Sequence, residues 1–247
     1  MQMTDTVKHL IIINVLLFII AGANVLPFVQ QTFPLYYFEN SSFVWYQLLT
    51  HMFMHGGVAH IAFNMFALYS FGSNLEHIWG SNKFLFFYFS CGLGAALIHT
   101  LSNYYFFNNE LSTLISEGFL KSDVVNLLNQ GKIDTRWTEI LGKSRLDNLA
   151  NSFAIPAVGA SGAIYGLLVA FGFMFPDAQL AMMFIPVPIK AKYFIPIIIG
   201  LDLFSGVTGV AIFGSGIAHF AHVGGAVFGA IIMLFWKNDQ FNNHRWN

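Results

Sequence analysis

Long apolar runs separated by short polar stretches dominate the pattern of this chain. A helix needs roughly 20 residues to cross the hydrocarbon core of a bilayer, and six runs are long enough. They cover residues 10–29, 58–79, 84–107, 154–175, 193–213 and 217–236. The pattern therefore predicts an all-α membrane protein, a bundle of six transmembrane helices that forms a single membrane domain over residues 1–247.

The first run has a second interpretation. Lys8 precedes its apolar stretch and small residues occupy 21–23, as in a cleaved signal peptide. However, apolar residues continue to Val29, and Asn14 would interrupt the core of such a peptide. We therefore favour a retained membrane helix.

Residues 108–152 have a different composition. They hold six of the twelve acidic residues and five of the eleven Lys and Arg residues. Residues 111–120 and 123–131 have the spacing of short amphipathic helices, the second closed by Gly131. We expect an extramembrane insertion between the third and fourth membrane helices.

Composition narrows the class of partner. The 247 residues are 56% hydrophobic and 9% charged, against about 25% charged residues in soluble domains. A net charge of −1 gives no electrostatic reason to expect a nucleic-acid partner. Because Cys91 is the only cysteine, an intrachain disulfide and a cysteine zinc cluster are excluded. The lipid bilayer is the expected environment.

Positive charges predict the orientation. Outside the insertion, the basic residues flank the termini and two of the connections: Lys8, Lys83, Lys190, Lys192, Lys237 and Arg245. The short connections after the first and fifth runs have none. Because Lys and Arg favour the cytoplasmic side, we expect both termini in the cytoplasm and the insertion outside. The protein is predicted to be a multi-pass protein of a bacterial inner (plasma) membrane.

Polar residues from three different runs fall at one depth. In this topology the second, fourth and sixth runs all enter from the outer face. Ser161 lies roughly 8 Å below Pro156 and His222 roughly 8 Å below Ile217, at 1.5 Å per residue, and His60 and Asn64 open the second run. A hydroxyl nucleophile needs a base within hydrogen-bond distance, usually an imidazole. Ser161 and His222 are therefore a candidate nucleophile and base.

Each of these features alone has a plainer interpretation. The pairs Gly162–Gly166 and Gly225–Gly229 are GxxxG motifs, which are typical of close helix packing. His60 and Asn64, four residues apart on one helix face, fit a polar contact between helices. Packing of the two GxxxG helices would also bring Ser161 to His222, so the two interpretations are compatible.

The other polar residues in the apolar runs receive the plainer interpretation. His51, His55 and His60 suggest a metal site, but Gly56–Gly57 interrupts their helix face and no cysteine or carboxylate stands among them. We predict no metal. Asp202, in the fifth run, is interpreted as an internal polar group with its own hydrogen bonds.

Three motifs in this order resemble the rhomboid family of intramembrane serine proteases. They are HGGVAHIAFN (55–64), GASGAIYG (159–166) and AHVGGAVFG (221–229). The resemblance covers residues 8–107 and 154–236, and it implies a rhomboid-like bundle of six transmembrane helices.

The resemblance also implies roles for residues of these motifs. Ser161 would be the nucleophile and His222 the general base, a dyad with no third carboxylate. His60 and Asn64 would donate hydrogen bonds to the oxyanion. The supporting residues would be Tyr165 packed on the base, His55 in the loop that lines the cavity, Gly225 where the sixth helix meets the fourth, and Glu76 as a structural acid. Gly159 also supports the site on its own chemistry, because a residue without a side chain near Ser161 would let a substrate backbone approach closely.

Two histidines of the sixth run compete for the role of base. His219 lies three residues before His222, about 4.5 Å nearer the outer surface by helical rise. We expect His219 to be wetter and free to titrate, and His222 to face Ser161. The fifth run, with Pro196 and Gly200, and residues 205–216 are candidate gate and cap elements.

Two features depart from the family pattern. Tyr46-Gln47 stands near the place where many members have Trp-Arg, so the role of that arginine is in doubt here. The insertion at 108–152 is also longer than the short connection that the resemblance implies.

The implied function is intramembrane serine endopeptidase activity on transmembrane segments of other membrane proteins, without a cofactor or metal. A proteolytically silent relative that retains client helices is one alternative, and the intact Ser161 and His222 argue against it. A proton-coupled transporter is another, but no inverted repeat of broken helices is visible.

Overall fold

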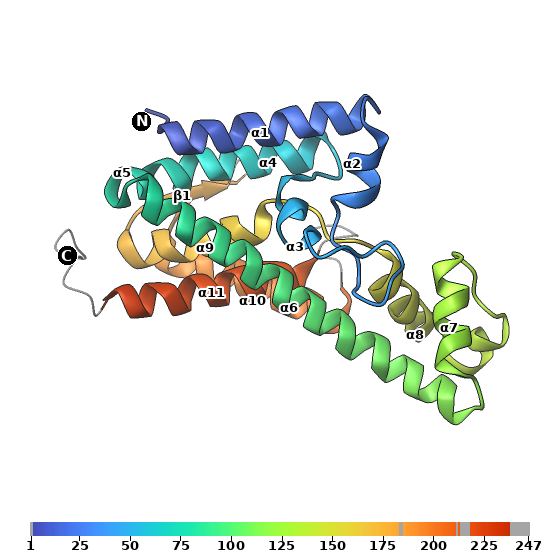
Figure 1. The fold of residues 1–247 in the computed structure, drawn as a ribbon. Coiled ribbons are helices and arrows are strands. Elements are labelled where there is room, and N and C mark those ends of the chain that lie inside the picture. The colour runs from blue at the N-terminus through green and yellow to red at the C-terminus, as the bar shows by residue number, and fades with distance from the viewer. Residues whose placement is uncertain (1, 183–184, 211, 213–217, 238–247) are drawn as a thin grey trace.

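Helices form most of the structure. The computed structural model describes residues 2–182, 185–210, 212 and 218–237. The longest helices are α1 (Asp5–Gly22), α6 (Ser81–Ser116), α10 (Ala191–Thr208) and α11 (His219–Lys237). These four are long and apolar enough to cross a membrane, and Figure 1 shows α1, α6 and α11 running along the long dimension of the molecule. The predicted class, an all-α membrane protein, is confirmed.

Two of the six predicted spans are not single long helices. Residues 58–79 form three consecutive helical segments: α4 (Val58–Ala67), the π-helical η2 (Leu68–Gly72) and α5 (Ser73–Trp79). The predicted span 154–175 contains α9 (Ser161–Met174), which has 14 residues. Four predicted spans are thus single helices of membrane-spanning length, and the other two are composite or short.

Short elements connect the long helices. Residues 23–57 contain α2 (Pro27–Thr32), α3 (Gln47–Thr50) and the 3₁₀ turn η1 (His51–Phe53). Between α9 and α10 the chain forms an antiparallel hairpin of β1 (Gln179–Met182) and β2 (Ile185–Lys190), which the apolar pattern did not predict.

Helix ends differ from the apolar runs for local reasons. The predicted first helix, 10–29, is wrong in its bounds, because α1 begins at Asp5 and ends at Gly22. α6 continues to Ser116, so residues 111–116 extend this helix and do not form a separate one. α9 begins only at Ser161, since Gly159 has a φ of 123° that ends any regular helix before it.

The predicted insertion holds a second bundle at one end of the molecule (Figure 1). It consists of α7 (Lys121–Asn129), close to the predicted 123–131, and α8 (Arg136–Ala154), which is interrupted at Gly142 (φ 71°). These helices and the end of α6 enclose buried side chains that we call the insertion cluster: Tyr37, Phe107, Leu111, Leu114, Val124, Leu128, Trp137, Leu141, Leu146, Leu149 and Phe153. Beside it, Arg145 Nε donates to Glu110 Oε2 at 2.6 Å.

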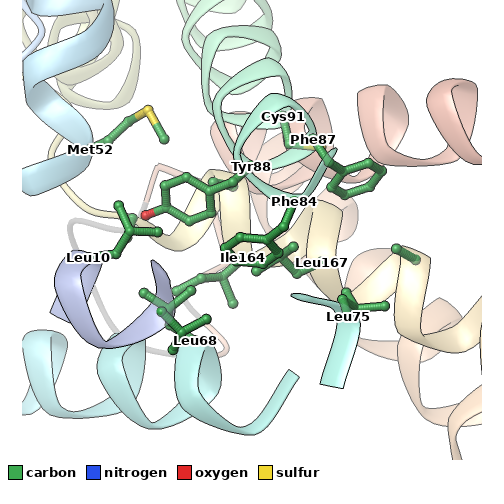
Figure 2. Packing of buried hydrophobic residues seen from close by; sticks show 14 of the residues in the cluster. Leu10, Met52, Leu68, Leu75, Phe84, Phe87, Tyr88, Cys91, Ile164 and Leu167 are labelled. Carbon is green, nitrogen blue, oxygen red and sulfur yellow. The ribbon is translucent and has the colours of Figure 1, made fainter. Parts of the chain in front are cut away.

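The main core lies where α1, η2, α6 and α9 meet. Leu10, Leu68, Tyr88 and Leu167 come from these four elements, and each is at most 5% exposed. Figure 2 shows their side chains converging in the same region. Lipid tails are as apolar as these side chains, so close packing is what holds such helices together.

Glycines bring α9 and α11 into backbone contact. A Cβ added at Gly229 would lie 2.8 Å from Gly166 Cα, and one at Gly166 would lie 3.1 Å from the carbonyl oxygen of Gly225. A Cβ added at Gly225 would lie closer still to the carbonyl oxygen of Gly162. The contact between the two GxxxG motifs is therefore confirmed, and it fixes the depth of α11 relative to α9.

Glu76 ties the start of α1 to the start of α6. Its carboxylate accepts hydrogen bonds from the backbone N–H groups of Thr6 (3.1 Å) and Val7 (3.0 Å) and from the Ser81 hydroxyl (2.8 Å). The Trp79 ring, at the end of α5, contacts the Trp236 ring of α11. The beginning of α1 and the end of α11 thus share one end of the bundle, and the insertion lies at the other (Figure 1).

Candidate active site

Ser161 is the first residue of α9, and the segment ahead of it is anchored by backbone hydrogen bonds. Leu35 and Ala157 exchange two such bonds of 2.9 Å, and the Gly159 N–H donates to the His51 carbonyl at 2.9 Å. The first N–H groups of a helix have no partner within the helix. The serine hydroxyl therefore stands beside backbone donors at a fixed helix start.

His222 of α11 faces this serine. Its Nε2 atom lies 2.8 Å from Ser161 Oγ. The Tyr165 ring, one turn further along α9, stacks on the imidazole with centroids 4.3 Å apart and planes 14° apart. The glycine contacts between α9 and α11 bring these three side chains together, although the hydroxyl and the imidazole are distant in sequence.

A carboxylate also faces the imidazole. Asp202 Oδ1 lies 3.2 Å from His222 Nδ1, and Oδ2 accepts a hydrogen bond from the Tyr165 hydroxyl. The resemblance implies a dyad with no third carboxylate, whereas the structure places this carboxylate beside the candidate base. Asp202 is on α10, so no local motif linked it to α11. The available signal was that an ionisable residue inside a membrane helix usually pairs with another polar group.

His219 is not the wet residue that was expected. Its side chain is 12% exposed, against 13% for His222, and its Nδ1 lies 2.5 Å from Asp202 Oδ1. The prediction that His219 is wetter is wrong because α10 packs over this part of α11: a Cβ added at Gly206 would lie 3.3 Å from the Cβ of His219.

His60 and Asn64 lie on α4, close to the serine. The Asn64 side-chain amide donates to the His60 carbonyl at 2.9 Å, so the two residues occupy one helix face. A Cβ added at Gly159 would lie 2.8 Å from His60 Nε2. The imidazole of His60 therefore lies directly over the backbone two residues before Ser161.

His55 lies behind His60, in the loop before α4. The two rings are 5.1 Å apart, and both ring nitrogens of His55 are buried without a hydrogen-bond partner in the described part of the chain. Burial lowers the pKa of His55 to about 4, so this imidazole is neutral near pH 7. Across the residues that the structure describes, no group of three or more His, Cys, Asp or Glu side chains is placed to hold a metal ion.

Gln47, which stands near the place where the resemblance implies an arginine, is fully buried. Its Nε2 donates to the carbonyls of Thr32 (3.0 Å) and Ser42 (2.8 Å), and its Oε1 accepts from the Tyr36 N–H (3.2 Å). The side chain therefore holds together the loop between α2 and α3. This role is structural and does not reach Ser161.

Comparison with known proteins decides the family. Residues 42–238, most of the chain, match the Rhomboid domain family. The chain belongs to the rhomboid family. The resemblance carried by the three motifs is confirmed at this level.

Relatives of this rhomboid come from mitochondria and from bacteria. The human presenilin-associated rhomboid-like protein, mitochondrial, is 27% identical over 243 residues, which is 95% of this chain and 50% of the relative. Rhomboid protease AarA of Providencia stuartii is 27% identical over 193 residues, covering 77% of this chain and 55% of the relative. Rhomboid protease GluP of Bacillus subtilis is 42% identical over 53 residues, 22% of this chain and 10% of the relative.

These matches limit which properties of the relatives can be stated for this chain. The chain spans about half the length of the relatives that it matches over most of its own length. Because mitochondrial proteins are among them, the predicted location in a bacterial inner membrane is not supported. What holds for this rhomboid is that it is a multi-pass integral membrane protein.

Proposed function

We propose that this rhomboid is an intramembrane serine endopeptidase that cleaves transmembrane segments of other membrane proteins. The observation that carries the proposal is the 2.8 Å distance between His222 Nε2 and Ser161 Oγ. A serine hydroxyl at its ordinary pKa is a weak nucleophile, and a hydrogen-bonded imidazole is the usual group that activates it. Names of relatives such as rhomboid protease AarA agree with this chemistry.

The reaction follows from these positions. Ser161 Oγ attacks the carbonyl carbon of the scissile peptide bond while His222 Nε2 takes the hydroxyl proton. His222 then gives this proton to the leaving amine, and the C–N bond breaks. Water, deprotonated by the same imidazole, hydrolyses the acyl-enzyme and releases the second product.

The oxyanion of each tetrahedral intermediate needs hydrogen-bond donors. His60 lies over Gly159, Asn64 shares its helix face, and the backbone N–H of Ser161 is at a helix start. We assign these three donors to the oxyanion. Donors held at this position act in surroundings of low dielectric constant, where they stabilise developing charge more than in water.

The substrate class follows from the location of the serine. A peptide bond within a helix is shielded until the helix unwinds. Its N–H and C=O groups are hydrogen-bonded to other backbone groups of the same helix. We therefore expect substrates whose transmembrane segments contain small or helix-weakening residues.

The proposal also includes the topology of the chain, with six membrane crossings. The segments α4, η2 and α5 together form one composite crossing, and α9 forms a short one. The proposal places both termini in the cytoplasm and the insertion, over residues 108–152, outside the membrane on the opposite side.

The test is labelling of the purified protein with a serine-reactive fluorophosphonate, together with cleavage of a model transmembrane substrate. We expect both in the wild type and neither in Ser161→Ala or His222→Ala. Ser152→Ala is the matched control, because Ser152 is a buried serine whose hydroxyl bonds within its own helix. Substantial cleavage by folded Ser161→Ala would refute the proposal.

A further inference from the structure

A fully buried carboxylate faces both histidines of α11. Asp202 is 0% exposed. Its Oδ1 lies 2.5 Å from His219 Nδ1 and 3.2 Å from His222 Nδ1, and its Oδ2 accepts from the Tyr165 hydroxyl. One side chain of α10 therefore contacts three polar side chains on the two helices that carry the candidate nucleophile and base.

Hydrogen-bonding partners explain how the charged carboxylate of Asp202 can be buried here. Burying a carboxylate is costly unless it is hydrogen-bonded or paired. Among the described residues, its ion-pair partners within 4 Å are the two histidines. An ionised carboxylate only accepts hydrogen bonds and has about four acceptor positions. The three donors around Asp202 therefore satisfy it without an arginine or lysine.

The carboxylate also dictates which nitrogen of His222 carries the proton. Because the carboxylate can only accept, the Nδ1 atom that faces it must donate. A neutral imidazole has one N–H, so Nε2 is left with a lone pair. That lone pair points at Ser161 Oγ, 2.8 Å away. This is the tautomer that a general base needs in order to take the hydroxyl proton.

We propose that Asp202 is a positioning residue that holds His222 in the Nδ1–H tautomer, so that Ser161, His222 and Asp202 act as a triad. This inference rests on the proposed function. Tyr165 contributes from both sides, because its ring stacks on His222 and its hydroxyl bonds to Asp202. After proton transfer, the charge of the imidazolium is stabilised by the carboxylate beside it.

The tautomer can be measured directly on the wild-type protein. Nitrogen-15 NMR of histidine-labelled protein in detergent, in alkaline buffer, distinguishes Nδ1–H from Nε2–H. The His222 signals are identified by their loss in His222→Ala. We expect Nδ1–H in the wild type and a shift toward Nε2–H in Asp202→Asn. A wild-type His222 protonated on Nε2, or the same tautomer in both proteins, would overturn the inference.

Turnover gives a second readout. Replacing the corresponding aspartate of a soluble Ser-His-Asp protease lowers kcat by about 10⁴-fold. We expect Asp202→Asn to lower kcat by about tenfold or more with KM nearly unchanged. Ser205→Ala is the matched control, because Ser205 is buried on the same helix and its hydroxyl has no hydrogen-bond partner in the described residues. A kcat that stays near the wild-type value, or one that falls equally in Ser205→Ala, would assign Asp202 to helix packing alone.

Failure of the inference differs from failure of the proposed function. If the wild type neither reacts with the fluorophosphonate nor cleaves substrate, the proposed function is wrong, and the tautomer measurement still tests the contact between Asp202 and His222. If the wild type is active and Asp202→Asn keeps both its kcat and its tautomer, only the inference is wrong. Since a wild-type His222 protonated on Nε2 would overturn the inference without Asp202→Asn, the inference stays falsifiable even if that variant folds poorly.

Discussion

His222 Nε2 lies 2.8 Å from Ser161 Oγ, although the two residues are 61 positions apart. Neither side chain reaches the other through a flexible loop: Ser161 is at the start of α9 and His222 is in the first turn of α11. The relative depth of these helices is set by glycine contacts such as Gly166 with Gly229. The candidate site is therefore as rigid as the helix packing beneath it.

The oxyanion assignment predicts a loss of rate in His60→Ala and Asn64→Ala. Removing one such donor in a soluble protease lowers kcat by roughly 100- to 1000-fold, and the Ser161 N–H remains in both variants. Steady-state cleavage of a model substrate measures the effect. Asn74→Ala is the control, because Asn74 makes the same side-chain bond to the carbonyl four residues earlier. Turnover near the wild-type level in both variants would make the pair structural.

Gly159 is predicted to tolerate no side chain. Its φ of 123° is unfavourable for any residue with a Cβ, and the added atom would lie 2.8 Å from His60 Nε2. We expect Gly159→Ala to slow fluorophosphonate labelling of Ser161 by about tenfold or more, since strain of this kind costs roughly 1–3 kcal/mol. Gly57→Ala should label normally, because Gly57 is extended (φ 173°) and open space surrounds it. Equal labelling of the two variants would contradict the close approach.

The sequence motifs predicted which residues lie close together more accurately than the apolar runs predicted where the helices begin and end. Apolar runs locate membrane helices because lipid requires about 20 apolar residues per crossing. They do not show where a helix stops, since α6 continues to Ser116 through polar residues that end the apolar run but not the helix. They also cannot show that α9 starts at Ser161, which depends on the backbone of Gly159 and on hydrogen bonds to Leu35 and His51.

Asp202 shows the limit of reasoning from spacing. Ser161 and His222 could be paired in advance because each lies at a similar depth in an apolar run. The same arithmetic places Asp202 six residues, or about 9 Å, before the end of α10, so its depth was available. Which face of α10 meets α11 was not available, because an apolar helix has no polar side that would reveal its rotation. That rotation is a property of the packed bundle.

Gln47 is predicted to stabilise the fold without contributing to the chemistry. Gln47→Ala would leave the Thr32 and Ser42 carbonyls and the Tyr36 N–H without their partner. An intramolecular hydrogen bond contributes roughly 0.5–1.5 kcal/mol net, so loss of the three bonds should lower the free energy of unfolding by about 3 kcal/mol. Thermal unfolding in detergent measures this change, with the exposed Gln130→Ala as control. Unchanged stability would show that the three bonds contribute little.

Acid is predicted to destabilise the protein through His51. Burial lowers the pKa of His51 to about 4 from its ordinary 6.5. As pH falls below 6.5, the unfolded chain therefore takes up a proton before the folded protein does, and stability declines until about pH 4. At about 1.4 kcal/mol per pKa unit, the loss is on the order of 3 kcal/mol. The melting temperature of His51→Gln should depend less on pH across this window, whereas His9→Gln, at an exposed position, should behave like the wild type. An unchanged slope in His51→Gln would contradict this assignment.

The last prediction separates the insertion from the candidate site. Trp137 is fully buried in the insertion cluster, and truncating a buried aromatic side chain to alanine costs roughly 3–5 kcal/mol. We expect Trp137→Ala to open α7 and α8, so that trypsin cuts faster at Lys132 and Arg136. Labelling of Ser161 should stay within about threefold of wild type, because the segment before it is held by hydrogen bonds to Leu35 and His51, which are not members of the cluster.

Trypsin added to one side of sealed vesicles extends this test to the topology. Cleavage in residues 108–152 should occur only from the side opposite the termini, and Trp45→Ala, at a 76% exposed position, should leave the cutting rate unchanged. Cutting from the side of the termini would refute the orientation.

Loss of Ser161 labelling in Trp137→Ala, with the other helices of that variant intact, would contradict the separation of the two regions. It would show that the insertion supports the start of α9. The hydrogen bond from the Asn40 side chain to the Phe153 carbonyl, and the contact of Tyr37 with Phe107, would then be the route by which it does so.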